Sequence, residues 1–161
     1  MLMNSKLKFR LANAADISAI ISVVNAAFAV EQFLEGTRTD PERMEHLMSE
    51  GQFLVGEDES GRIVASAYSQ LRGDRGYLGM LAIHPSRQGS GLGRPLIEFG
   101  EKYLRQHGCK FADLTVLSLR TELPPIYRHW GYTEIGTDEF HPSQPLKPGF
   151  ECHCINMAKP L

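Results

Sequence analysis

The residues of this chain that are best suited to chemistry form a glycine-rich turn at the start of a helix. Gly89, Gly91 and Gly93 are three glycines in five residues, shortly after an apolar segment that ends at Ile83. Glycines let backbone N–H groups come close to a ligand, because no Cβ stands in the way. The N-terminus of a helix attracts anions through its unpaired N–H groups and its dipole. The turn therefore predicts a phosphate site, and most of all a pyrophosphate site.

The residues around the turn narrow the choice of phosphate ligand. Arg87 and Arg94 flank it and add positive charge. A P-loop needs Lys and then Ser or Thr after its last glycine, but Arg94 and Pro95 stand there. The glycines also lack the Gly-x-Gly-x-x-Gly spacing of a dinucleotide-binding (Rossmann) fold. An ordinary strand–helix turn without a ligand and a nucleotide-phosphate protein remain the alternatives.

Two segments together resemble a known family. Residues 88–93 read Gln-Gly-Ser-Gly-Leu-Gly, which resembles the Q/R-x-x-G-x-G/A signature of GNAT-type acetyltransferases. Residues 81–85 are similar to the strand that leads into this signature, and residues 127–132 resemble the family's Tyr-x-x-x-Gly-Phe/Tyr segment. The resemblance runs from Leu7 to the end of the chain. It implies the acyl-CoA N-acyltransferase fold and an N-acetyltransferase that uses acetyl-CoA.

The resemblance also implies where acetyl-CoA binds. In this family the co-substrate lies in a V-shaped gap between two splayed central strands, which correspond here to residues 77–83 and 111–117. Backbone groups of Leu81 and Ile83 would pair with the pantetheine arm, and amides near Leu81 and Ala82 would lie by the acetyl carbonyl. The acetyl-CoA contacts carried over are Leu81, Ala82, Ile83, Gln88, Gly89, Ser90, Gly91, Leu92, Gly93 and Arg94.

The resemblance assigns Tyr127 the role of general acid for the leaving thiolate. A phenol is a neutral donor at pH 7, which suits that role; a packed core aromatic is the alternative. Many relatives also carry a catalytic Glu on the strand that ends at Ile83, but residues 77–83 contain no acid. Glu31, Glu35 and His84 are the nearest candidates for a base, and a water relay is equally open, so no base is assigned.

Two other segments bear on the ligands. Many relatives carry an Asn shortly before the tyrosine, where it binds pantetheine, whereas this chain has Arg120, which we expect to reach CoA or its phosphates. In relatives the link between the first two helices lines the acceptor pocket. Its acids and aromatics would suit a cationic amine with an apolar body, and the alternative is helix packing with a solvated charge cluster. The acceptor residues predicted there are Phe28, Glu31, Phe33 and Leu34.

The cysteines favour a reducing compartment. Their number, 3, is odd and gives no disulfide framework, so we expect free thiols and a cytoplasmic protein. Cys152 and Cys154 would face one side of a strand and His153 the other, so we expect no metal site there. Cys109 is expected to be structural. The segment most rich in apolar residues, 14–30, is too polar to span a bilayer, and residues 1–8 do not resemble a secretory signal.

Composition and periodicity give the fold that must position these residues. The chain has 161 residues, 42% of them hydrophobic, and a net charge of -2, which predicts one domain over residues 1–161 and argues against nucleic acid as a partner. The order of the expected elements predicts a mixed α/β sheet covered by helices, and the resemblance implies that the sheet is mostly antiparallel, splayed between two parallel strands, with helices on both faces. The strands expected are 7–11, 52–57, 62–71, 77–83, 111–117, 132–136 and 150–158, and the helices 16–28, 41–51, 92–107 and 123–130, with a loop at 139–149.

The function predicted from the sequence is an acetyl-CoA-dependent N-acetyltransferase. A primary amine, on a small molecule or a protein, would attack the thioester directly. A non-catalytic acyl-CoA-binding or sensing module of the same fold is the alternative, because the strand Glu and the Asn are missing. We expect no membrane partner and leave a homodimer open.

Overall fold

The chain folds around one mixed sheet, which a computed structural model describes over residues 7–141 and 144–161. In this part of the chain the strand order is β1-β2-β3-β4-β5-β7-β6. β4 and β5 are parallel, and the other neighbouring strands are antiparallel. The strands are β1 (Lys8–Leu11), β2 (Gln52–Glu57), β3 (Ile63–Arg72), β4 (Arg75–Ile83), β5 (Phe111–Leu117), β6 (Thr133–Glu139) and β7 (His153–Pro160). The α-helices are α1 (Ile17–Phe28), α2 (Pro41–Glu50), α3 (Gly93–Gln106) and α4 (Leu123–His129), and short 3-10 turns cover Ala14–Asp16 and Pro85–Arg87.

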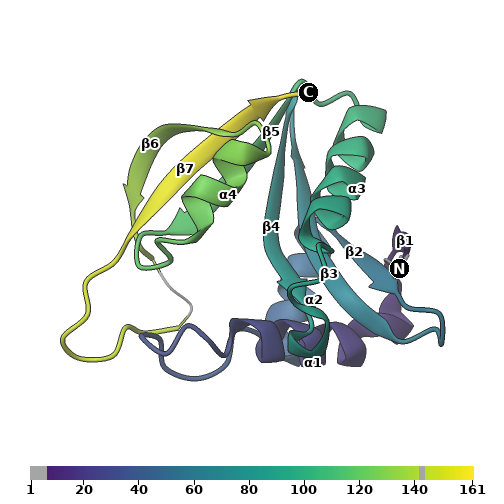
Figure 1. Ribbon diagram of the computed structural model, residues 1–161, viewed down its shortest axis with the longest axis horizontal. Helices are drawn as coiled ribbons and strands as arrows, with labels where there is room; N and C mark the ends of the chain where they lie inside the picture. Colours follow the sequence, from purple (N-terminus) through teal and green to yellow (C-terminus); the bar gives the residue numbers. More distant parts are fainter. Residues whose placement is uncertain (1–6, 142–143) are drawn as a thin grey trace.

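Helices α1 and α2 cover one face of the first half of the sheet. The apolar face of α1 presents Ile20 and Val24, which are fully buried beside Phe53 of β2. α2 begins where the Asp40 side chain accepts a hydrogen bond from the backbone N–H of Arg43 at 2.8 Å, with a proline in the first turn. These helices cross the lower edge of the molecule in Figure 1.

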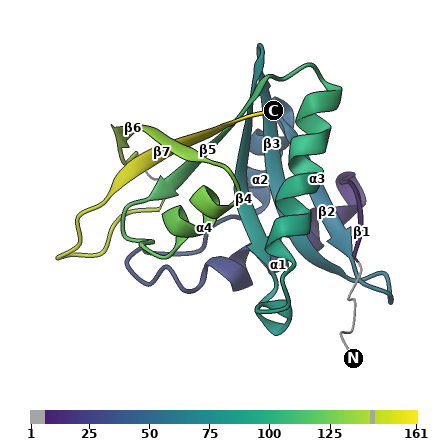
Figure 2. The ribbon, with the colours of Figure 1, turned by 45° about the horizontal axis from the view of Figure 1, so that its top comes forward.

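Helices α3 and α4 lie on the other side of the sheet, one to each side of β4, as Figure 2 shows. Leu96 of α3 is buried against β3, and Ile97 and Leu104 of α3 share a core with β4, β5 and β7. Tyr127 and Trp130 at the end of α4 pack against this same core. Leu96, Ile97 and Leu104 therefore hold α3 against the sheet.

The central strands β4 and β5 separate after a short contact. Their register covers only Arg75 to Tyr77 on β4, paired with Phe111 to Asp113 on β5. Beyond the Tyr77–Asp113 pair, no further register pair joins β4 and β5. The two strands diverge toward the lower part of Figure 1. The splayed pair expected from residues 77–83 and 111–117 is confirmed.

A bulge in β4 lies beside the opening. Ser66 of β3 is opposite Ala82 and Tyr68 is opposite Gly79, so Met80 and Leu81 share one position across the ladder. Met80 has a φ of +50°, which is uncommon for a residue with a side chain. A bulge leaves one residue unpaired and redirects the strand locally. It frees backbone groups near Leu81 at the edge of the opening.

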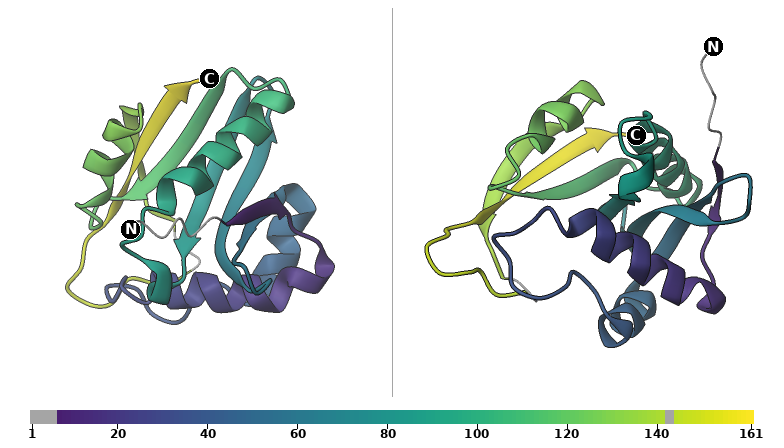
Figure 3. Two further views of the ribbon diagram at one scale, coloured as in Figure 1. Left: turned by 45° about the vertical axis from the view of Figure 1, so that its right-hand side comes forward. Right: turned by 60° about the horizontal axis from the view of Figure 1, so that its bottom comes forward.

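The end of the chain differs from the sequence expectation. The closing strand begins at His153, not Phe150, and the strand before it runs on to Glu139. β7 lies between β5 and β6 and pairs with both, and these partners fix its length. Phe150 instead packs against Phe33, with ring centroids 6.3 Å apart. The β6–β7 loop thereby lies along the α1–α2 link, where Leu34 forms an isolated bridge with Leu146 (Figure 3).

Candidate active site

The glycine turn between β4 and α3 presents a row of open backbone donors. Gly89 and Gly91 have φ values of +81° and +76°, and an added Cβ at either would meet no atom within 4 Å. Within the described residues, the N–H groups of Gly89, Ser90, Gly91 and Leu92 donate to no protein acceptor. Gly89, Ser90 and Gly91 are exposed, so their N–H groups are open to an external acceptor such as a phosphate.

Side chains shape the turn on both sides. The Gln88 amide donates to the Ile83 carbonyl at 3.1 Å and fastens the turn to the end of β4. Trp130 of α4 covers the first residue of α3, since a Cβ on Gly93 would lie 3.2 Å from its ring. The Nε of Arg94 lies 3.5 Å from Glu98 on the exposed side of α3.

A cavity of about 380 Å³ lies in the opening between β4 and β5. Its lining includes Gln88, the residue just before the glycine turn. Of the cofactor residues expected from the sequence, Leu81, Ile83 and Arg120 also line it, whereas the Ala82 side chain is 1% exposed and packs in the core beneath α1. An extended chain with backbone-like polar groups would fit between the two strands.

Tyr127 of α4 lines this cavity from the β5 side. Its ring is held edge-on by Trp130 and Tyr132, with centroids 5.8 Å and 6.2 Å away. Burial raises the pKa of Tyr127 from 10.0 to about 12; the nearby Arg120 guanidinium acts in the opposite direction. The phenol is therefore protonated at neutral pH and can donate a proton into the cavity.

Two arginines and two carboxylates form a cluster at the opening, in which the Nε of Arg120 donates to Glu122 at 3.2 Å. The Arg120 guanidinium donates to one oxygen of Glu31 at 2.8 Å, and Arg38 donates to the other at 3.2 Å. The Glu31 side chain is only 4% exposed. Two guanidinium groups thus surround one buried carboxylate. We expected Arg120 to reach CoA and Glu31 to face a cationic amine, and in this structure both groups are bound to each other.

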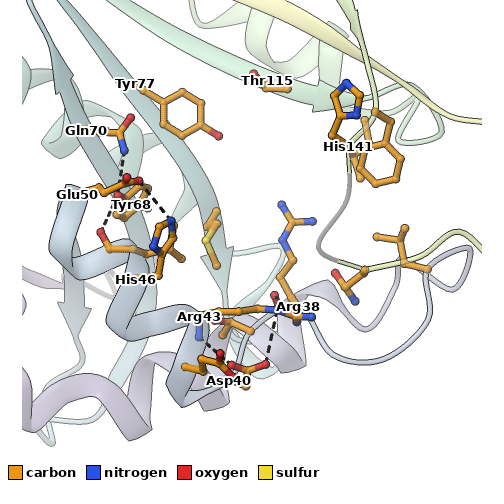
Figure 4. Close-up of a pocket in the computed structure, with 18 of the residues that line it drawn as sticks. Arg38, Asp40, Arg43, His46, Glu50, Tyr68, Gln70, Tyr77, Thr115 and His141 are labelled. Atoms are coloured by element: carbon orange, nitrogen blue, oxygen red, sulfur yellow. Dashed lines mark hydrogen bonds and ion pairs between the residues drawn. The ribbon is translucent and has the colours of Figure 1, made fainter.

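A second cavity of about 910 Å³ adjoins the first on the α2 side of the sheet. Figure 4 shows its walls, with α2 on one side and the β6–β7 loop on the other. Five residues line both cavities: Arg38, Tyr77, Met80, Thr115 and Leu117. The two cavities therefore meet at the bulge, where the strands have just separated.

The acceptor residues predicted from the sequence are divided between these cavities. Phe28 and Glu31 line the opening, and Leu34 lines the second cavity. Phe33 is 9% exposed and packs against Phe150, so it supports the link and lines neither cavity. Three of the four predicted residues therefore line one of the two cavities, and Phe33 packs behind them.

The candidate bases from the sequence lie away from the junction. His84 caps the turn after β4, where its ring lies 2.8 Å from the Ser86 hydroxyl, and it lines neither cavity. Glu35 also lies outside both linings. Glu31 is held by its two arginines. Among the described residues, the carboxylates that line the second cavity are Asp40, Glu42 and Glu50, all on or next to α2.

Sequence reasoning missed the role of Tyr77. Its ring points into the second cavity (Figure 4), and an added Cβ on Gly79 would lie 2.4 Å from its hydroxyl. The ring therefore needs a glycine two residues along the same strand face. That Tyr-x-Gly pattern was the available signal.

The remaining sequence features carry no site. Among residues 7–141 and 144–161, no cluster of three or more His, Cys, Asp or Glu side chains could hold a metal ion. The Cys152 thiol lies 3.6 Å from the Ser118 hydroxyl, just before β7 begins. None of the described helices has the length and apolar character needed to cross a membrane.

Comparison with known proteins agrees with this geometry. The model of the acetyltransferase (GNAT) domain matches residues 22–142. A mycothiol acetyltransferase of Propionibacterium freudenreichii subsp. shermanii is 27% identical over 142 residues, which cover 82% of this chain and 45% of that protein. The chain therefore spans less than half the length of that curated relative.

Solved structures show the same fold. The ribosomal-protein-S18-alanine N-acetyltransferase of Escherichia coli has a TM-score of 0.77 at 20% identity, covering 96% of this chain and 94% of that one. An acetyltransferase of Bacillus subtilis in complex with CoA has a TM-score of 0.74 at 11% identity, covering 97% and 99%. With the splayed strands, the glycine turn and the family match over most of its length, this chain belongs to the GNAT acetyltransferase family.

Proposed function

We propose that this protein transfers an acetyl group from acetyl-CoA to a primary amine by direct attack. The observation that carries the proposal is the continuity of three features: the open amides at Gly89 to Leu92, the cavity between β4 and β5, and the second cavity beyond it. They match, in order, a diphosphate, a pantetheine arm with its thioester, and an acceptor.

On the donor side, the residues present fit coenzyme A. The turn offers N–H groups without Cβ atoms at Gly89 and Gly91, which suits a diphosphate at a helix N-terminus. The bulge at Met80 leaves backbone groups near Leu81 free for the arm or for the acetyl oxygen. An N–H aimed at that oxygen would stabilise the negative charge that develops on it during attack.

The Tyr127 hydroxyl is placed for the second proton transfer. When the amine nitrogen bonds to the carbonyl carbon and the C–S bond breaks, the sulfur takes the electron pair and needs a proton. Tyr127 reaches into the donor cavity and is protonated at neutral pH, because burial raises its pKa to about 12. We therefore assign it as the general acid.

The first proton transfer has no dedicated carboxylate. Glu31 is occupied by Arg38 and Arg120, and Asp40, Glu42 and Glu50 belong to the α2 wall. The amine would enter as free base or lose its proton to water in the second cavity. The missing carboxylate is also what favours the second candidate function, an acyl-CoA-binding module that does not turn over.

The test separates binding from turnover. Acetyl-CoA binding is measured by calorimetry, and free thiol release is measured with a panel of primary amines, including amino acids, diamines and peptides. Binding together with amine-dependent thiol release supports the transferase. Binding without release from any amine supports the binding module, and failure to bind acetyl-CoA contradicts both. Gly91→Asp serves as the variant that should bind least.

We further propose that the protein works in the reducing environment of the cytoplasm. Its three cysteines, Cys109, Cys152 and Cys154, are free thiols. Free cysteines persist in such compartments and tend to be oxidised outside them. Mass spectrometry of protein isolated under thiol-blocking conditions tests this, because disulfide-linked forms would contradict it.

A further inference from the structure

We propose that the acceptor is an amine that carries a carboxylate beside its nitrogen, as an α-amino acid does, and that Arg38, Arg72 and Tyr77 recognise it. This inference rests on the proposed function and names the substrate class for the same site. It replaces the cationic acceptor expected from the sequence.

The first observation is the charge at the junction of the two cavities. Of the described residues that line both, Arg38 is the one that carries a charge; its companions are Tyr77, Met80, Thr115 and Leu117. The thioester must lie at this junction if the diphosphate lies on the glycine turn. The charge nearest to the reacting nitrogen is therefore positive.

The second observation is that Arg38 has only a shared carboxylate as its partner. Arg38 stacks on Phe28, with its guanidinium carbon 4.6 Å from the ring centroid, and donates to one oxygen of Glu31, whose other oxygen accepts from Arg120. Arg120 is paired in addition with Glu122 at 3.2 Å. The outer N–H groups of Arg38 can therefore donate to the carboxylate of an acceptor.

The third observation is a second guanidinium, which packs over the ring of Tyr77. The guanidinium carbon of Arg72 lies 4.6 Å from the centre of the Tyr77 ring. Its Nε donates to the Gln70 side chain at 2.7 Å, and no carboxylate of the described chain pairs with it. Arg72 lines the second cavity, so its remaining N–H groups are available to an anion there.

Tyr77 lies under the Arg72 guanidinium, and together with Arg38 it lines both cavities. Among the described residues its hydroxyl has no hydrogen-bond partner, although the ring is largely buried and lines both cavities. Burial raises its pKa, and Arg38 and Arg72 act against that rise. A neutral phenol can accept a hydrogen bond from the amine and donate one to a carboxylate, so it can hold both groups of an amino acid.

The acids of the second cavity are placed elsewhere. Asp40 caps α2 and lies 3.6 Å from Arg43, and Glu50 lies 3.6 Å from His46. Figure 4 shows these pairs along the α2 wall, apart from the Tyr77 hydroxyl. The cavity therefore has the Arg38 guanidinium at the junction and paired acids and bases along its far wall. This order fits an anionic group close to the reacting nitrogen.

The experiment compares each amino acid with its own carboxamide. Thiol release gives kcat/KM for both members of a set of pairs with apolar, polar and acidic side chains. The carboxamide has the less basic amine and so more free base at neutral pH, which favours it chemically. We nevertheless expect the free acid to be preferred at least about tenfold, the size of one lost charged hydrogen bond.

Two variants locate the preference. Arg72→Gln should reduce it about tenfold while acetyl-CoA affinity stays unchanged, because Arg72 lines only the acceptor cavity. Arg43→Gln is the matched control: it removes an arginine of the same cavity that is bound to Asp40 and to the Thr37 carbonyl. It should keep the preference for the acid.

The outcomes distinguish this inference from the proposed function. Carboxamides or diamines that react as fast as the acids would overturn the inference and leave the transferase intact. If no amine releases thiol, the transferase fails. Calorimetry with CoA-saturated protein then still tests the inference, because the acid must bind more tightly than the carboxamide, and Arg72→Gln must remove the difference.

Discussion

Arg120 and Glu31 form an ion pair at 2.8 Å although 89 residues separate them in the chain. Glu31 lies in the α1–α2 link, and Arg120 follows β5. The pair therefore joins the two halves of the splayed sheet at their open end, where Arg38 binds the second oxygen of the same carboxylate. It fixes one wall of the donor cavity and holds the Arg38 guanidinium where the two cavities meet.

Removing this carboxylate should cost stability. In Glu31→Gln, one buried charge with two cationic partners becomes neutral, Arg38 loses its counter-ion, and Arg120 keeps only its pair with the exposed Glu122. We expect a loss of about 2–3 kcal/mol and a Tm lower by roughly 5–10 °C. Thermal unfolding followed by circular dichroism measures it. Arg128→Gln is the control, because its pair with Glu134 is half-exposed and should shift the stability by less than about 0.5 kcal/mol.

Tyr127→Phe should separate turnover from binding. Loss of a general acid lowers a rate by about 100-fold or more, whereas the ring that packs between Trp130 and Tyr132 is kept. We expect kcat to fall by this factor and the Kd of acetyl-CoA to change less than about threefold. Tyr103→Phe on α3, which stacks on His107, controls for loss of a phenol elsewhere. An unchanged kcat in Tyr127→Phe would remove the acid role.

The stability of the protein should fall in alkaline solution. The pKa of Tyr127 is about 12 in the folded protein and 10.0 without the surrounding structure. Folding therefore favours the protonated phenol. The contribution of this phenol to the free energy of unfolding is fully present below pH 10 and is lost as the pH rises to 12. The pKa of Tyr132 is raised in the same direction by burial and by Glu101. Urea unfolding between pH 8 and about 11 should show decreasing stability, with a smaller slope in Tyr127→Phe.

An acidic residue in the glycine turn should abolish the diphosphate site. Gly91→Asp brings a negative charge to the row of open amides, and we expect acetyl-CoA affinity to fall at least about 100-fold. Gly61→Asp is the control for backbone strain. Gly61 lies in the β2–β3 turn with a φ of +82°, close to the +76° of Gly91, and neither site has an atom within 4 Å of an added Cβ. Equal affinity in both variants would show that the turn does not hold the diphosphate.

Much of this arrangement could be predicted because it depends on short stretches of sequence. The cap at Asp40, the apolar spacing of α1 and α3, and the glycines at 89 and 91 act through neighbours within one or two turns of chain. The helices and most strands were therefore found within a few residues. The closing strand was wrong at its start, because pairing with β5 and β6 decides where β7 begins.

The acceptor side could not be predicted in this way. Glu31, Arg38 and Arg120 come from two segments, and their charges could be balanced only once packing brought them together. From composition alone, Glu31 indicated a cationic substrate; in the folded protein its charge is already satisfied.

The sequence by itself determined the family resemblance, the helix that presents the glycine turn, and the tyrosine that follows the fifth strand. Only the tertiary structure decided where β4 and β5 part, that the bulge at Met80 opens there, and that Arg38 and Tyr77 meet at the junction of the two cavities. The physical reason is the distance along the chain over which each kind of interaction acts. Backbone conformation and caps depend on adjacent residues, whereas the charge and shape of a cavity depend on side chains that only the packed sheet brings together.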